Sequence, residues 1–303
     1  MPADHPGVLA TSLKVTGRCP IGWAVALAAS AVLAASAAPA VAAGPPTRSI
    51  SSNWAGYVAL GSGPTARFTS VAGTWRQPHV SCSAGRASYS AVWVGLGGYH
   101  QSASTLEQVG TDADCSSTGR AVYSSWYELL PAGPVELPIR IRPGDVVASS
   151  VTTRGLHVTL RIRDVTSGTR FSTTARVARL DLSSAEWIVE APSECQTSGA
   201  CTTLALSDFG DVAFAGASAT ARGHTGAISD PLWSATALEL RQSTPRTGGR
   251  GQAGASGQPA DSIVAATPGD TTPASGAFSV SWQQQAVLAD EPSAPTLPAA
   301  GPS

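Results

Sequence analysis

The sequence has few charged residues and almost no lysine. Charged residues make up 13% of the 303 residues, against roughly 25% in an average globular protein. Lys14 is the single lysine. This scarcity, together with the abundance of Ala and Gly in the whole sequence, is typical of a high-GC bacterial gene. The formal net charge is -1, and no basic stripe is visible along the sequence, so nothing indicates nucleic-acid binding. Hydrophobic residues reach 43%, which allows a large core.

Long amphipathic helical patterns are absent after residue 43. Short segments rich in Val, Ile, Thr and Trp alternate with Gly, Pro, Ser and Asp, at a spacing of roughly 8–12 residues. This pattern predicts an all-β sandwich or barrel. The predicted strands are Ser52–Leu60, Thr69–Arg76, Ser88–Leu96, Thr105–Gly110, Ala121–Leu129, Val147–Thr153, His157–Asp164, Arg170–Ala175, Ser184–Ala191, Asp211–Ala217 and a closing strand at Phe278–Trp282.

Residues 1–43 have the pattern of an export signal. Lys14 and Arg18 precede the apolar segment Ile21–Ala37, and small residues at Ala40–Ala43 suit cleavage. The alternative is a membrane anchor, but the apolar segment is shorter than the ~20 residues that a span needs. We therefore expect a secreted, extracellular protein without a membrane segment after cleavage.

Cleavage would remove Cys19 and leave four cysteines. An even number in an exported chain predicts disulfides, and four cysteines allow three pairings. A short turn separates Cys195 from Cys201, so a local bridge is the simplest choice, and Cys82 would then pair with Cys115. A zinc site is the weaker alternative, because no Cys-x-x-Cys and no paired His accompany these cysteines.

The C-terminal part changes in composition. Arg241–Ser275 is rich in Gly, Pro, Ser, Thr and Ala and has no aromatic residue, which predicts a flexible insertion. The tail, residues 284–303, is rich in Pro and predicted to be disordered. One domain is therefore expected over residues 44–283.

Strand alternation assigns side chains to faces. In the segment that ends at Glu190, Trp187 and Val189 share the face predicted to be core, so Glu190 projects from the other face. The same argument places Trp93 outward, and places Trp126 and Glu128 together on one face. Aromatic residues beside carboxylates can form a groove that binds a polymer and shifts a pKa. The alternative is that each Trp is an ordinary strand residue without a role in binding, because large aromatic residues favour strands.

Familiar nucleophile and metal patterns are missing. No histidine lies in a nucleophile motif, no Gly-x-Ser-x-Gly occurs, and no two histidines have metal-ligand spacing. An aspartic protease would need two aspartate loops, but Asp270-Thr271-Thr272 has no partner loop. The remaining possibility is catalysis by carboxylate and amide side chains that project from a β-sheet.

Five short motifs follow one another along the sequence. They are Ser52–Gly56 (SNWAG), Trp93–Gly98 (WVGLGG), Leu106–Gly110 (LEQVG), Trp126–Glu128 (WYE) and Ala185–Glu190 (AEWIVE). Their order resembles that of the glutamic peptidases, also called eqolisins or the peptidase A4 family. Asp208–Gly210 and the short loop between Cys195 and Cys201 are similar to later features of that family.

The resemblance implies a concanavalin A-like sandwich of two curved antiparallel β-sheets and an acid endopeptidase that pepstatin does not inhibit. It implies that Glu190 is the catalytic base and that Gln108 is its partner, together activating a water molecule. A glutamate of ordinary pKa, about 4.3, would stay ionised where histidine is already protonated. We expect polypeptide substrates, no metal, no organic cofactor and a monomer.

The sequence also departs from the fungal pattern. Gly97 and Ser124 stand where fungal members carry aspartates, which predicts a less acidic pH optimum. Asp112 and Glu128 match family carboxylates and are expected to support the site, beside Gly97 and the groove residues Trp93 and Trp126.

Two further glutamates lie close to the predicted catalytic residues in the sequence. Glu107 falls on the opposite face from Gln108, and Glu186 is expected to be a groove residue at most.

Three other functions stay open at this stage. A lectin-like, carbohydrate-binding protein could use outward Trp93 and Trp126 to stack on sugars. A glycosidase could use Glu190 and Glu128 as its carboxylate pair, which leaves Gln108 without a role. A catalytically inactive protein of the cell surface is the third.

Overall fold

A computed structural model describes the folded part of the chain. The residues it describes are 44–61, 63, 67–100, 103–195, 201–243, 262–272 and 275–283. The predicted signal peptide, residues 1–43, and the predicted tail, residues 284–303, lie outside the described residues.

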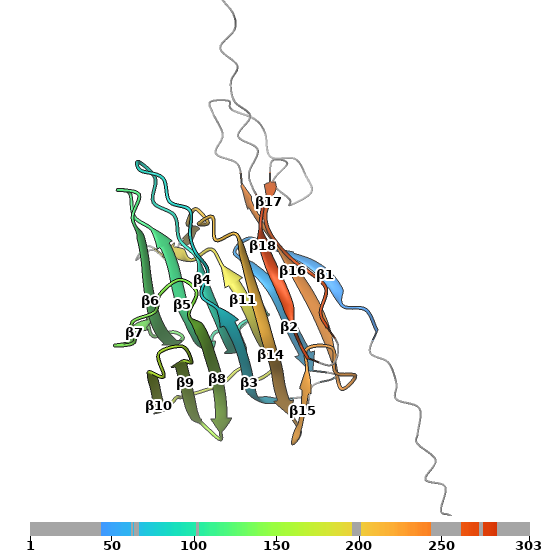
Figure 1. Cartoon of the computed structure of the whole chain (residues 1–303). Coiled ribbons are helices and arrows are strands. Elements are labelled where there is room, and N and C mark those ends of the chain that lie inside the picture. Colours follow the sequence, from blue (N-terminus) through green and yellow to red (C-terminus); the bar gives the residue numbers. More distant parts are fainter. Residues whose placement is uncertain are drawn as a thin grey trace, which may run out of the picture. The chain divides into compact units, whose positions relative to one another are not determined.

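The described chain is entirely β-structure and forms two layers (Figure 1). One continuous path of hydrogen-bonded strands runs through both layers, and β17 and β18 connect them along one edge. Layer I contains β10 (Arg170–Arg176), β9 (His157–Asp164), β8 (Val146–Arg154), β3 (Phe68–Arg76), β14 (Asp211–Ala221) and β18 (Phe278–Trp282). Layer II contains β17 (Ser262–Pro268), β16 (Trp233–Ser243), β2 (Trp54–Gly61), β11 (Ser184–Glu190), β4 (Ala91–Leu96), β5 (Glu107–Cys115), β6 (Ala121–Leu129) and β7 (Val135–Glu136).

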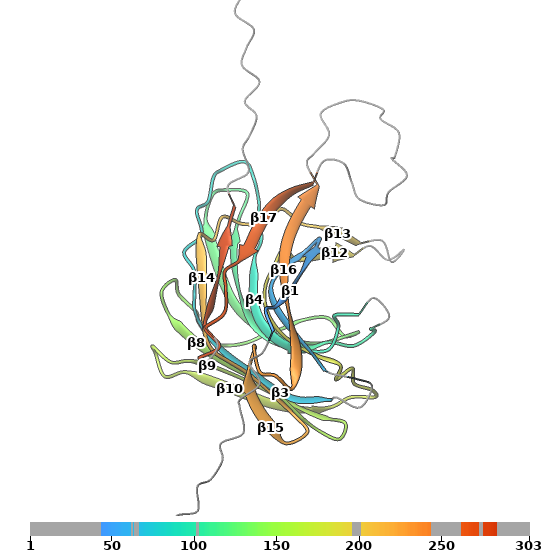
Figure 2. The ribbon, with the colours of Figure 1, turned by 90° about the vertical axis from the view of Figure 1, so that its right-hand side faces the viewer.

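Shorter strands complete the fold. β15 (His224–Ala227) pairs with β14, and β12 (Ser193–Cys195) pairs with β13 (Cys201–Thr203) in a separate hairpin. β1 (Thr47–Ser51) pairs with β16 in parallel, whereas the other ladders between strands are antiparallel. The predicted β-sandwich is confirmed, and Figure 2 shows β14 and β16 on opposite sides of it.

The main core lies between the layers. β3 and β8 of layer I face β4 of layer II, and β9 faces β5. Trp75 and Trp187 are among the largest fully buried side chains there, and Phe214 stacks on Phe278 with ring centroids 4.7 Å apart. Burial of each large apolar side chain contributes roughly 1.5–3 kcal/mol, so this interface provides most of the driving force for folding.

A second, smaller cluster covers the other face of layer II. It contains Trp93, Ile188 and Trp126, with Trp54 packed against it. Val189 lies instead in the main core. The predicted alternation along β4 and β11 is therefore confirmed, and it gives layer II a second apolar face on which polar side chains can be held.

The predicted flexible insertion, Arg241–Ser275, is partly wrong. β16 continues through Ser243, and Ser262–Pro268 forms β17. Residues 244–261, in the middle of that stretch, lie outside the described residues. β17 escaped detection because its buried positions include the small residues Ala265 and Ala266, which are poor indicators of strands.

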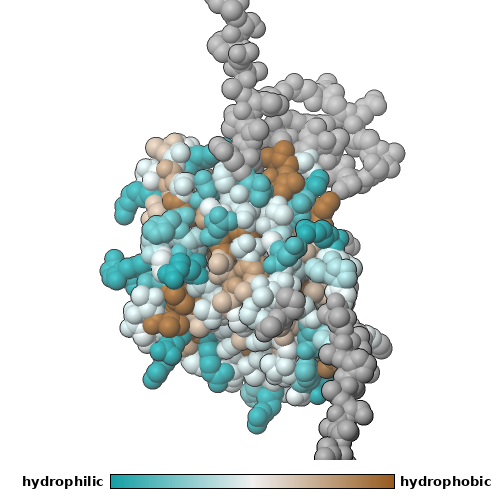
Figure 3. All heavy atoms as spheres, turned by 45° about the vertical axis from the view of Figure 1, so that its right-hand side comes forward, coloured by the Kyte–Doolittle hydropathy of each residue, from teal (hydrophilic) through white to brown (hydrophobic). Residues whose placement is uncertain are grey.

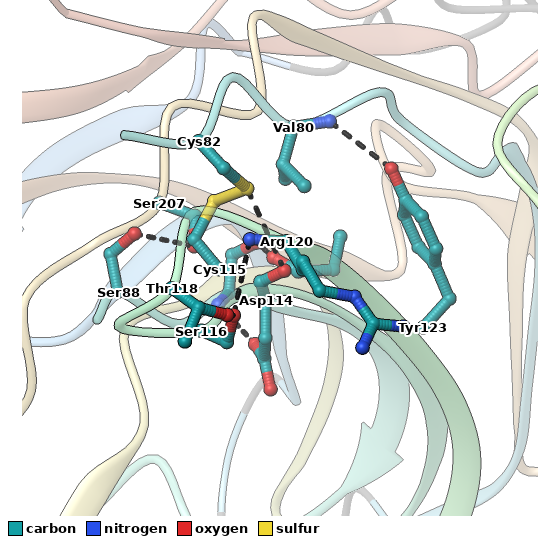
Figure 4. The surroundings of a disulfide bond; sticks show 12 residues. Val80, Cys82, Ser88, Asp114, Cys115, Ser116, Thr118, Arg120, Tyr123 and Ser207 are labelled. Atoms are coloured by element: carbon teal, nitrogen blue, oxygen red, sulfur yellow. Dashed lines mark hydrogen bonds between the residues drawn. A yellow bond between two sulfur atoms is a disulfide. The ribbon is translucent and has the colours of Figure 1, made fainter. Parts of the chain in front are cut away.

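Both predicted disulfides are confirmed. Cys82 is bonded to Cys115 and Cys195 is bonded to Cys201. The first bridge ties the segment after β3 to the end of β5 (Figure 4). Beside it, the hydroxyl of Tyr123 accepts the backbone N–H of Val80 at 3.3 Å.

On the face shown in Figure 3, hydrophobic residues form small separate patches among hydrophilic ones. Within the described ranges, no helix is long and apolar enough to cross a membrane.

Candidate active site

Glu190 is the last residue of β11, and two N–H donors hold its half-buried carboxylate. Trp93 Nε1 donates to Oε2 at 2.8 Å, and Asn53 Nδ2 donates to Oε1 at 3.1 Å. The ring of Trp54 packs edge-on against Trp93, with centroids 5.0 Å apart. The Trp54 indole N–H has no hydrogen-bond partner among the described residues, yet it lies near enough to lower the pKa of Glu190.

Gln108 faces the same side of layer II as Glu190, with one strand between them. On that strand, β4, Gly95 lies opposite Gln108 and Ala91 lies opposite Glu190. A side chain at Gly95 would crowd Trp93, Leu106 and Gln108. Glycine at position 95 therefore leaves room above the strand for these three side chains.

Glu128 binds Gln108 and acts on Glu190 through its charge. Gln108 Nε2 donates to Glu128 Oε2 at 2.6 Å, which fixes the orientation of the amide. Gln108 Oε1 is buried and has no partner among the described residues, so it is free to accept a hydrogen bond from water. Burial raises the pKa of Glu128, and the bond from Gln108 lowers it.

Burial raises the pKa of Glu190 to about 7. The hydrogen bonds from Trp93 and Asn53 favour the ionised form and oppose this shift, whereas the charge of Glu128 adds to it. The expectation of an ordinary glutamate pKa is therefore wrong. In acid most molecules carry a proton on Glu190, and the fraction in the base form grows as the pH approaches 7.

Asp112 lies in the same cross-strand row as Glu190, since Ala91 pairs with both. Ser124 Oγ donates to Asp112 Oδ2 at 2.5 Å, and Trp126 Nε1 donates to Oδ1 at 2.7 Å. Burial raises the pKa of Asp112, and these two bonds lower it. Asp112 and Ser124 thus fix the ring of Trp126 at the edge of the site.

The two groove tryptophans are more buried than predicted. Trp93 is 0% exposed and Trp126 is 9% exposed, because both pack into the second apolar cluster. The prediction that Trp93 lines an open groove is wrong: its indole N–H supports Glu190 from below. The half-buried groups on this face include Glu190, Glu128 and Asp112.

Gly97 shapes the backbone and supplies no chemical group. Its φ is +80°, and an added Cβ would lie 2.3 Å from the backbone oxygen of Asp181. An aspartate, as in the fungal pattern, would require the backbone to move here. The carboxylate missing at this position is therefore a consequence of the tight approach of the Asp181 segment.

Two further carboxyls lie buried near the site. Glu107 is 1% exposed on the core face, as its parity predicted, and Glu186 is 0% exposed, so it is not a groove residue. None of their four carboxyl oxygens has a hydrogen-bond partner among the described residues. Burial, followed by the charge of Asp181, raises the pKa of Glu107 to about 8. Burial also raises the pKa of Glu186 well above its ordinary value.

Asn53 is the residue of this site that sequence reasoning missed. It lies within the first motif, Ser52–Gly56, but its type alone gave it no role. Ser51 Oγ accepts the backbone N–H groups of Asn53 and Trp54 at 3.4 and 3.1 Å, which turns the chain so that Asn53 reaches Glu190. Its position directly before a tryptophan at a strand start was the available signal.

A cavity of about 860 Å³ includes Ser52, the chain neighbour of Asn53, in its lining. It contains neither Glu190 nor Gln108. Its lining is mixed and includes Ser81, Ser88, Thr203, Asp208 and Gln242 beside the apolar Leu206 and Trp282.

Comparison with known proteins agrees with this geometry. The model of the peptidase A4 family matches residues 52–248. The chain belongs to the peptidase A4 family. Aspergillopepsin-2 of Aspergillus niger is 30% identical to this A4 peptidase over 222 residues, which cover 66% of the chain and 73% of the relative. Membership makes the chain a glutamic peptidase and confirms the resemblance seen in the motifs.

Solved structures place the A4 peptidase in the same fold. Scytalido-glutamic peptidase with a peptide-based transition-state analogue has a TM-score of 0.59 at 24% identity and covers 78% of this chain and 100% of its own. Aspergilloglutamic peptidase from Aspergillus niger has a TM-score of 0.50 at 25% identity, over 65% of this chain and 99% of its own.

In the described parts of the A4 peptidase, no three His, Cys, Asp or Glu side chains are grouped so that they could hold a metal ion.

Proposed function

We propose that Glu190 and Gln108 activate a water molecule that hydrolyses peptide bonds inside polypeptide chains. The single observation behind this proposal is the arrangement of three side chains on one face of layer II. Gln108 is held by Glu128 at 2.6 Å, and the charge of Glu128 acts on the carboxyl of Glu190. In this proposal, a water molecule bridges the carboxylate base and the neutral amide donor on this face.

The proposed reaction needs these groups alone. Ionised Glu190 removes a proton from a water molecule held between its carboxylate and Gln108, and the water oxygen attacks the scissile carbonyl carbon. The Gln108 amide N–H that does not bind Glu128 donates to the developing oxyanion. Protonated Glu190 then transfers its proton to the leaving amine as the C–N bond breaks.

The pKa of Glu190 sets the pH range of this reaction. A base is most effective when its pKa lies near the working pH. With the pKa of Glu190 at about 7, the active form accumulates as the pH rises through the acidic range. We propose a mildly acidic optimum, less acidic than an ordinary glutamate would give.

Two observations favour the peptidase over the other candidates. A lectin would need exposed aromatic rings, but Trp93 is fully buried. A glycosidase would use Glu128 as its second carboxylate, but Glu128 accepts a short hydrogen bond from Gln108. In the peptidase mechanism, the hydrogen bond from Trp93 to Glu190 and the hydrogen bond from Gln108 to Glu128 both have a function.

We also propose the cellular setting predicted from the sequence. The two disulfides support an oxidising compartment, and thus export directed by residues 1–43 of a bacterial protein. The mature enzyme would be a monomeric domain over residues 44–283, secreted and free of a membrane segment.

Digestion of casein between about pH 3 and pH 8, with and without pepstatin, tests the proposal. We expect proteolysis that pepstatin does not reduce, because pepstatin targets a pair of aspartates that this site lacks. Binding to glycans without proteolysis at any pH would favour the lectin. Complete inhibition by pepstatin would contradict the Glu/Gln mechanism.

A further inference from the structure

The outer face of layer I carries an unexpected concentration of arginine. Every second residue of β9 points away from the core, and the same holds for its neighbours β8 and β10. We call this surface the arginine face. Its exposed cationic residues are Arg154, Arg161, Arg163, Arg170 and Arg176, beside exposed His157.

Strand pairing brings these charges together in two groups. Arg163 lies directly opposite Arg170, with Arg161 two residues along the same face. At the other end of β9, His157 pairs with Arg154 on one side and with Arg176 on the other. The sequence indicated no basic stripe, because the arginines are spread over three strands and become neighbours only in the sheet.

No acidic side chain at the outward positions of β8, β9 and β10 neutralises the arginines. None of them forms an ion pair with a described residue. Asp164 is the single acidic residue between Val146 and Arg176, and it is fully buried on the core side. Like charges directly opposite each other destabilise a sheet, so this arrangement has a cost in folding that an external anion would remove.

Protection of a sheet edge explains only part of the pattern. Charged side chains on an edge strand prevent edge-to-edge aggregation, and β10 is such an edge. Arg161 and Arg163, however, lie on β9, which is paired on both sides. Their charges therefore require another explanation.

The surface between the arginines indicates the chemistry of a partner. It carries short hydroxyl side chains, among them Thr152, Thr159, Ser172 and Thr174. No aromatic side chain other than His157 stands at the outward positions of β8, β9 and β10. The face thus lacks platforms for base stacking and a broad apolar surface for membrane insertion.

We propose that the arginine face binds an anionic polysaccharide. Arginine forks match carboxylate and sulfate groups in a bidentate manner, and the hydroxyl side chains can bond sugar hydroxyls. The two cationic groups are separated by the four residues from His157 to Arg161, about 14 Å along the strand. A linear polymer with repeated charges can reach both groups, whereas a single small anion cannot.

This surface lies behind the candidate active site. β9 packs on β5 across the main core, and β5 carries Gln108 on its opposite side. A polysaccharide bound to β8–β10 would therefore hold the enzyme on an anionic matrix while the peptidase face remains accessible. The binding itself does not depend on the proposed catalytic mechanism.

Retention on immobilised polygalacturonate tests the proposal, with uncharged dextran as the reference matrix. At about pH 5.5 sugar carboxylates are ionised, and low salt, about 50 mM, limits screening. We expect the mature protein to bind polygalacturonate and not dextran. The triple variant Arg161→Gln, Arg163→Gln, Arg170→Gln should bind about tenfold more weakly, because each exposed contact contributes modestly.

A matched variant separates the arginine face from overall charge. Arg67→Gln, Arg86→Gln, Arg120→Gln removes three exposed arginines elsewhere and should bind within about twofold of the wild type. Hydrolysis of a soluble peptide by both triple variants verifies that they fold. Equal loss of binding in both variants, or unchanged binding in the first, would overturn the proposal. So would binding through this face to single-stranded DNA or anionic phospholipid vesicles but not to polygalacturonate.

Discussion

Trp93 is completely buried, yet its indole N–H reaches the carboxylate of Glu190 and donates to Oε2 at 2.8 Å. The two residues lie on adjacent strands, and Trp93 is paired with Ile188, two positions before Glu190. The bond stabilises the ionised carboxylate against the opposing effect of burial. Trp93 is therefore a positioning residue that tunes the proposed base.

Replacing Trp93 by Phe should raise the pKa of Glu190 further. Loss of one hydrogen bond to a charged group, about 1.5–3 kcal/mol, corresponds to roughly one to two pKa units. Activity at about pH 5 should then fall roughly tenfold or more, with partial recovery near neutral pH. The pH dependence of kcat/KM measures this shift. Trp126→Phe, which loses a bond to Asp112 instead, should leave the acidic limb in place.

Glu190→Gln and Gln108→Ala should each abolish most proteolysis. The first removes the base, and the second removes an oxyanion donor worth roughly 100–1000-fold in turnover. Initial rates on a fluorogenic peptide measure the loss, and circular dichroism verifies folding. Glu194→Gln, on the exposed hairpin strand β12, is the control and should retain wild-type rates. A folded variant of either residue with normal turnover would end the assignment.

Glu128 should have two separate effects. Its charge should shift the pH profile, and its hydrogen bond should hold the side-chain amide of Gln108 in place. Glu128→Gln keeps an acceptor for Gln108 but removes the charge that raises the pKa of Glu190. We expect the acidic limb of kcat/KM to move to lower pH. Glu128→Ala also releases the amide and should lower kcat in addition. Identical profiles for the two variants would show that the contact with Gln108 has no catalytic effect.

Much of this arrangement follows from residue alternation. Parity along β11 and β4 places Glu190 and Trp93 on one face, so their shared face could be predicted. The motifs identify Gln108, so its role could be predicted as well. The depth of burial could not, because it depends on how Trp93 and its neighbours from several strands pack together. β17 was missed because its buried alanines give little strand signal. The arginine face was missed because the pairing of three strands, and not proximity in the sequence, creates it.

Stability should decrease as the pH rises through the neutral range. The folded-state pKa of Glu107 is about 8, above its ordinary value of 4.5, so the folded protein binds this proton more tightly than the unfolded chain. Its contribution is complete below about pH 4.5 and is lost as the pH rises towards about 8. Glu186 acts in the same direction. Asp114, whose pKa burial and Asp112 raise to about 7, adds to the effect.

Glu107→Gln and Glu186→Gln should therefore flatten the dependence of Tm on pH. The amide cannot ionise, so each variant should gain stability relative to the wild type at about pH 7.5 compared with about pH 4. Thermal unfolding across this range measures the difference. Glu194→Gln, with an exposed side chain, should follow the wild-type curve. Parallel curves for all four proteins would refute the role of the buried pair.

The two disulfides should differ in their contributions to stability. Cys82–Cys115 closes a segment of 33 residues and Cys195–Cys201 a segment of 6. On the loop-entropy model, replacing the first pair by serine should cost about 3.7 kcal/mol, and replacing the second about 2.2 kcal/mol. Urea denaturation of the two double variants measures both values. A larger loss from the short bridge would contradict this order.

The position of β11 determines when the enzyme can first act. This strand is inserted between β2 and β4, which precede it by a long stretch of chain, and it brings Glu190 to the face that already holds Gln108. Such non-local pairings form late and slowly in folding. A nascent chain that has not yet incorporated this central strand lacks one half of the proposed catalytic pair. On the proposed mechanism, proteolysis therefore requires that β11 has paired with both of its neighbours.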